Sequence, residues 1–73
     1  MTRIEEYYVD HIPTMEDIEE AFGIVKEKGN ILVRIVWFVP YSGTYKRVIS
    51  IEDVETKTVK EWFDEEMPKC YPV

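Results

Sequence analysis

The chain is poor in the residues from which catalytic and metal sites are built. Its 73 residues include one cysteine, Cys70, and one histidine, His11. A lone cysteine forms no disulfide within the chain, so Cys70 is interpreted as an unpaired thiol. No second histidine or cysteine stands at metal-ligand spacing, so we expect no metal site and no cofactor. We expect no catalytic dyad from Asp10 and His11, because adjacent side chains need not point together.

Glycine and long hydrophobic runs are also scarce. The three glycines, Gly23, Gly29 and Gly43, are scattered and form no phosphate-binding loop. The longest apolar stretch, residues 31–39, is interrupted by Arg34 and is far shorter than the roughly 20 residues of a membrane-spanning helix. These features predict a cytoplasmic protein that is not an enzyme and does not enter a membrane.

Basic residues are outnumbered by acidic ones. Nine lysines and arginines face 15 aspartates and glutamates, which gives a formal net charge of −6. Such a chain is repelled by nucleic acids and by anionic membranes. We therefore expect no direct nucleic-acid binding, and a basic protein is the electrostatically natural partner. The alternative is that the negative charge serves solubility alone.

Hydrophobic residues are sufficient for one core. They make up 45% of the chain, with 14% aromatic residues, so residues 1–73 are expected to form a single folded domain. A chain of this size buries only about 60% of the surface that it exposes when unfolded. Because neither a disulfide nor a metal is available to stabilise it, homodimerisation is predicted.

The first half of the chain predicts a strand, a helix and a second strand. Residues 3–9 mix β-forming residues with acids and are typical of an edge strand. Thr14 and Asp17 form the pattern of a capping box, which starts a helix that ends at Gly29-Asn30. Residues 31–39 are apolar on both faces, which predicts a central strand that is covered on both sides.

The second half predicts a returning strand and a second helix. Residues 44–51 alternate in polarity and are expected to complete a hairpin, and residues 52–56 are interpreted as a polar connection. Thr58 and Glu61 form a second capping box, and Pro68 ends the helix that follows. The predicted fold is α+β with the order β-α-β-β-α, a small three-stranded, mainly antiparallel sheet with two helices packed on it.

Acidic residues are arranged in rows on both predicted helices. At about 100° per residue, the first row falls opposite the apolar face of its helix. The second row lies on the outward side of its helix, and its members Asp64 and Glu65, with Glu66, stand late in the helix, where acids oppose the helix dipole. We interpret the rows as a partner-binding surface, with solvated helix faces as the alternative. The first row is Glu16, Glu19, Glu20 and Glu27, and the second is Glu61, Asp64 and Glu65.

Tyrosine supplies a second type of binding residue. Five tyrosines cannot all be buried in so small a domain, and exposed tyrosines are enriched at interfaces. Tyr7, Tyr8 and Tyr41 are predicted to be interface aromatics. Their simplest use is a dimer contact through the first strand, and the alternative is packing at the edge of the core.

The clusters Glu16-Asp17-x-Glu19-Glu20 and Asp64-Glu65-Glu66, together with small size and acidity, give the chain an overall character. In this character it resembles the small host-takeover proteins of bacteriophages that act as DNA mimics. The resemblance implies a non-enzymatic inhibitor in the host cytoplasm that binds a basic, DNA-binding protein. Histone-like nucleoid proteins and other host DNA-binding proteins are the candidate targets. The alternative function is a regulatory or structural subunit that binds through a tyrosine-rich sheet edge.

Overall fold

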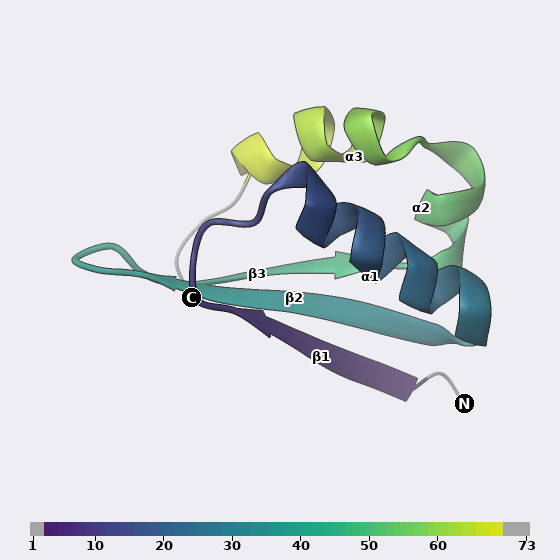
Figure 1. Ribbon diagram of the computed structural model, residues 1–73, viewed down its shortest axis with the longest axis horizontal. Helices are drawn as coiled ribbons and strands as arrows, with labels where there is room; N and C mark the ends of the chain where they lie inside the picture. Colours follow the sequence, from purple (N-terminus) through teal and green to yellow (C-terminus); the bar gives the residue numbers. More distant parts are fainter. Residues whose placement is uncertain (1–2, 70–73) are drawn as a thin grey trace.

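The computed structural model describes residues 3–69, which form a three-stranded sheet with helices on one of its sides (Figure 1). The strand order is β1-β2-β3, and the predicted α+β class is confirmed. Cys70 lies outside the described residues. The elements are β1 (Arg3–Val9), α1 (Met15–Lys28), β2 (Ile31–Val39), β3 (Gly43–Ile49), α2 (Ile51–Thr56), α3 (Val59–Glu66) and the 3-10 helix η1 (Met67–Lys69).

The sheet is mixed, and the prediction of a mainly antiparallel sheet is wrong. β1 runs parallel to β2, from the pair Arg3 and Ile31 to the pair Val9 and Trp37. β2 and β3 form the predicted antiparallel hairpin. The 14 residues of α1 form a crossover long enough to return the chain to the end where β1 began, and such a crossover connects parallel strands.

The first helix begins and ends as its sequence predicts. The Thr14 hydroxyl accepts a hydrogen bond from the Asp17 backbone N–H, and the Asp17 carboxylate accepts one from the Thr14 backbone N–H at 2.8 Å. Gly29 closes the helix with φ of 76°, a left-handed conformation that glycine adopts without steric cost. Its N–H donates to the Val25 carbonyl at 2.7 Å.

The segment predicted as a polar connection contains a helix, α2, so the order is β-α-β-β-α-α. β3 ends at Ile49, and Ser50 is the N-cap of α2, where its hydroxyl accepts from the Asp53 N–H. The Asp53 carboxylate accepts from the Ser50 N–H at 3.0 Å. A helix of six residues is unstable alone. Its existence depends on the packing of Ile51 and Val54 against the core.

The core lies between the helices and the face of the sheet toward them. Trp62 of α3 is fully buried and meets Phe22 of α1 edge to face, with ring centroids 6.3 Å apart. Trp62 therefore joins the two longer helices to each other. The buried apolar residues clustered here are Ile18, Ala21, Phe22, Val25, Ile31, Val33, Ile35, Trp37, Ile49 and Trp62.

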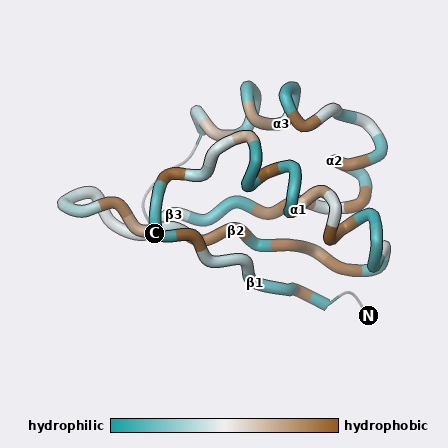
Figure 2. Tube along the Cα trace, viewed as in Figure 1, coloured by the Kyte–Doolittle hydropathy of each residue, from teal (hydrophilic) through white to brown (hydrophobic). Residues whose placement is uncertain are grey.

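β2 is central, as predicted, but helices cover only one of its faces (Figure 1). Figure 2 shows hydrophobic residues along most of the strand, because the face away from the helices is apolar too. There Phe38 is 60% exposed and its strand neighbour Val36 is buried among adjacent side chains. We call this side the open face, and the strand registers place on it Ile4, Glu6, Tyr8, Leu32, Arg34, Val36, Phe38, Thr44, Lys46 and Val48.

Candidate functional site

The outward side of α1 carries the first predicted row of acids, which we call the α1 acidic row. The opposite side of the same helix is buried in the core, so the helical repeat directs the carboxylates to solvent. An open hollow of about 460 Å³ is lined by three of them, Glu16, Glu19 and Glu20. The complete row, exposed along its length, is Glu16, Glu19, Glu20 and Glu27.

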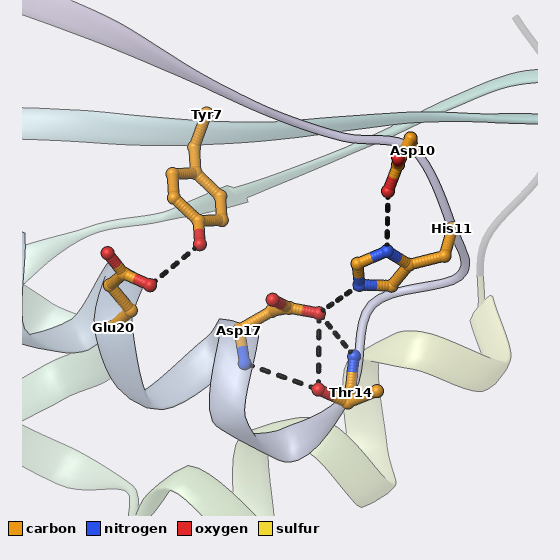
Figure 3. Close-up of polar contacts among 6 residues, drawn as sticks. All are labelled: Tyr7, Asp10, His11, Thr14, Asp17 and Glu20. Carbon is orange, nitrogen blue, oxygen red and sulfur yellow. Dashed lines mark hydrogen bonds and ion pairs between the residues drawn. The ribbon is translucent and has the colours of Figure 1, made fainter.

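One member of this row is held by the sheet. The Tyr7 hydroxyl of β1 donates to the Glu20 carboxylate at 2.9 Å (Figure 3). Burial and then this hydrogen bond raise the pKa of Tyr7 to about 12, so the phenol remains a donor at neutral pH. Glu20 thus has a fixed orientation, and Tyr7 is committed to a contact within the chain.

The other three members of the α1 acidic row lack a basic partner. Within residues 3–69, no ion pair joins Glu16, Glu19 or Glu27 to a lysine, arginine or histidine. Lys28 on the same helix points to β1, where its amine lies 2.8 Å from the Glu5 carboxylate. The negative charge of the row is therefore left for solvent or for a partner.

The acids of the second predicted row are already engaged. Glu61 accepts from the Thr58 backbone N–H at 3.0 Å in the capping box of α3, and this hydrogen bond lowers the pKa of Glu61. The Lys60 amine lies 2.8 Å from Asp64, and the Lys57 amine lies 3.4 Å from Glu65. The structure brings this row together on α3 but supplies each member with a local role.

The end of α3 is also stabilised by a residue of another element. Arg47 of β3 donates through Nε to the Glu66 carbonyl at 3.1 Å and through Nη2 to the Lys69 carbonyl at 2.6 Å. A guanidinium at a helix C-terminus complements the helix dipole. It offsets the unfavourable placement of acids that the sequence predicted there, so this placement no longer argues for a partner.

The predicted interface tyrosines do not form one surface. Tyr7 and Tyr8 point to opposite faces of β1, and Tyr8 lies on the open face with 71% exposure. Tyr41 is fully exposed in the turn between β2 and β3, with φ of 66°. Only Tyr8 belongs to an extended apolar surface, and the sequence signal that could have found it is the alternation of β1.

His11 lies between two carboxylates at the start of α1 (Figure 3). Its Nδ1 is 2.8 Å from Asp10, and its Nε2 is 2.9 Å from Asp17. Asp10 and His11 do point together, because the loop after β1 turns the ring back onto Asp10. Hydrogen bonds with Asp10 and then Asp17 raise the pKa of His11.

The Asp17 carboxylate has a structural task in this cluster. Burial acts to raise its pKa, but hydrogen bonds from the Thr14 backbone, from His11 and from the Thr14 hydroxyl outweigh burial, and the pKa of Asp17 is lowered. Two carboxylates facing both ring nitrogens favour the imidazolium, which donates from both. The cluster joins the loop to the cap of α1.

Residues 3–69 contain no group of three histidine, cysteine, aspartate or glutamate side chains placed to hold a metal ion. Among the same residues, no helix is both long and apolar enough to cross a membrane. Comparison with known proteins found no matching family model, no similar curated protein and no similar solved structure.

Proposed function

We propose that this chain is a non-enzymatic protein-binding domain that presents carboxylates to a basic partner, as an inhibitor that mimics the charge of nucleic acid. The single observation that supports the proposal is the uncompensated charge of the α1 acidic row. Glu16, Glu19 and Glu27 are exposed and have no basic partner within the described residues, whereas each acid predicted on α3 has a cation or a cap beside it.

The spacing of the row sets the strength of the expected interaction. Glu16, Glu20 and Glu27 follow one another by about 6 and 10 Å along the helix axis. Each strand of B-DNA carries a phosphate every 3.4 Å or so, so the row is a sparser array of charges. We expect it to engage about three basic side chains on a DNA-binding protein, with histone-like nucleoid proteins as the first candidates.

The test is displacement of DNA from such a protein. A labelled duplex bound to a purified histone-like nucleoid protein is titrated with the chain, and the fluorescence anisotropy of the duplex is followed. Wild type should displace the duplex. The triple variant E16Q/E19Q/E27Q should compete about tenfold less well, since each exposed ion pair contributes little by itself.

A second triple variant controls for net charge. E52Q/E55Q/E65Q removes the same number of charges from α2 and α3 and should compete nearly as well as wild type. Direct binding of wild type to the nucleoid protein should weaken as the salt concentration rises, because salt screens attraction between exposed charges. Equal competition by the two triple variants, or no displacement by wild type, would contradict the proposal.

A second candidate function is favoured by the open face. A regulatory or structural subunit that binds through the sheet requires exposed aromatic or apolar residues there, and Tyr8 and Phe38 meet this requirement at 71% and 60% exposure. In that case, substitution of Tyr8 should abolish partner binding while the glutamate variants leave it unchanged.

A further inference from the structure

Among residues 3–69, the large apolar side chains that are exposed to solvent are concentrated on the open face. The registers place Ile4 beside Leu32, and Tyr8 beside Val36, with the row of Glu6 and Arg34 between these two apolar pairs. Soluble monomers rarely expose contiguous apolar patches beyond a few hundred Å². The exposed fractions are 50% for Ile4, 71% for Tyr8, 60% for Phe38 and 40% for Val48.

The charged members of the open face are few and partly paired. The Arg34 guanidinium lies 3.4 Å from the Glu6 carboxylate on the neighbouring strand. Lys46 stands on β3, at an edge of the sheet, beside Val36. A lysine at the edge can bury its aliphatic stem and keep its amine in water. The face can therefore be covered without isolating a charge.

We propose that the open face binds the same face of a second copy of this chain, forming a symmetric homodimer. Charge distribution points to this occupant. The face carries one acid, Glu6, and two bases, Arg34 and Lys46, which gives it a formal charge of +1. Since the net charge of the chain is −6, the remaining residues together carry −7. Two copies that meet through their sheets hold these acids apart on the outer helix layers, beyond the reach of strong repulsion.

The composition of the face argues against other classes of occupant. A basic protein finds no excess of acid here, and a nucleic acid finds only two cations. When the open faces of two copies pack together, the apolar side chains of both copies are buried. A two-fold symmetric interface uses the same patch of each subunit in this way. Two such sheets pack about 10 Å apart with their strands roughly 30° from parallel.

The area of the face limits the strength of a dimer. Three strands about 4.8 Å apart and seven residues of about 3.3 Å give a surface of roughly 14 by 23 Å. Pairing two such surfaces buries about 640 Å² in total, below the roughly 1,200 Å² at which stable specific interfaces begin. We therefore expect a dissociation constant on the order of 10 μM, and not an obligate dimer.

The test is sedimentation equilibrium of the intact chain from about 5 to 300 μM, a range that brackets the expected constant. Wild type should shift with concentration from the monomer mass of 8.7 kDa to twice that value. F38D places a carboxylate on the central strand of the interface and should weaken association at least tenfold. The matched control is I12D, since Ile12 is 61% exposed against 60% for Phe38 and lies away from the open face.

Circular dichroism tests whether each variant is folded. If F38D is unfolded, Y8D serves as a second interface variant. The dimer does not depend on the proposed function, because E16Q/E19Q/E27Q leaves the open face intact and should associate like wild type. Wild type that remains monomeric over the whole range overturns the proposal. So does association that F38D and Y8D leave unchanged, because it then uses a different surface.

Discussion

His11 joins the loop after β1 to the first turn of α1 through two carboxylates, Asp10 and Asp17. The pKa of His11 is raised above its ordinary value of 6.5 by its hydrogen bonds with Asp10 and then Asp17. The folded state therefore holds the imidazole proton more tightly than the unfolded state does. By linkage, this proton adds stability that is fully present below pH 6.5 and is lost as pH rises through the folded pKa.

We expect the unfolding free energy of wild type to fall as pH rises above about 6.5 and through the raised pKa of His11. His11→Gln has no titrating ring and should show a flatter profile. Urea unfolding followed by circular dichroism at several pH values gives both profiles. The carboxylates contribute with the opposite sign, since the lowered pKa values of Asp10 and Asp17 matter below pH 4 or so. Parallel profiles for wild type and His11→Gln would refute the assignment.

The surroundings of His11 include contacts that the sequence predicts and contacts that it does not. The Thr14–Asp17 capping box is a local pattern of four residues and was predicted from the sequence. The approach of His11 to both carboxylates depends on the turn through Pro13, which no periodicity encodes. Glu20 was predicted as an exposed acid, but its hydrogen bond to Tyr7 requires α1 to lie over β1.

At the level of elements, the three helices begin with the same chemistry. A serine or threonine is followed three residues later by an acid at Thr14, Ser50 and Thr58. The boxes that precede α1 and α3 were predicted. The box at Ser50 was not predicted. Ser50 directly follows β3, and the alternation of polar and apolar residues in that strand continues through Ser50 to residue 51. Such a box is readable in sequence, but a helix as short as α2 is decided by packing.

Trp62 is the residue on which the position of α3 depends. Trp62→Ala removes the largest fully buried side chain and should cost about 3–5 kcal/mol of unfolding free energy. That is a large share of the roughly 4–11 kcal/mol expected for a chain of this length. Trp62→Phe should cost less. It keeps an aromatic ring near Phe22 and removes an indole N–H that has no hydrogen-bond partner among residues 3–69.

Urea unfolding measures both Trp62 variants, with Lys60→Ala as a control at an exposed position of the same helix. The control should unfold close to wild type, because its pair with Asp64 is exposed to solvent. A Trp62→Ala protein within about 1 kcal/mol of wild type would show that α3 is held by other contacts.

At the level of the whole molecule, acids and exposed apolar residues lie on different sides. The acids of α1 and α3 belong to the helix layer (Figure 1), and the strand registers place Ile4, Tyr8, Phe38 and Val48 on the open face of the sheet. This separation allows two independent contacts, a basic partner on the helices and a second copy on the sheet. A dimer formed in this way presents two α1 acidic rows on opposite outer surfaces.

If the open face pairs with a second copy, thermal stability must depend on protein concentration. We expect the melting temperature of wild type to rise by roughly 3 to 5 °C for a tenfold increase in concentration above the dissociation constant. The melting temperature of F38D should depend on concentration less than that of wild type does. Differential scanning calorimetry of both proteins over the same range provides the comparison. A concentration-independent wild-type melting temperature would count against the dimer.

The local features of this protein follow from its amino-acid sequence: two capping boxes, the glycine stop of α1, the central apolar strand, the hairpin and the rows of acids. Each depends on residues within a few positions of one another, where helix and strand periodicity act. Tertiary structure alone decided the direction of β1, the existence of α2 and the side of the sheet that the helices cover. It also decided which acids remain without a cation among residues 3–69, because Lys57 reaches Glu65 and Lys28 turns away from the α1 acidic row to Glu5. These features depend on how separate elements pack, and an apolar strand looks the same in sequence whether helices cover one of its faces or both.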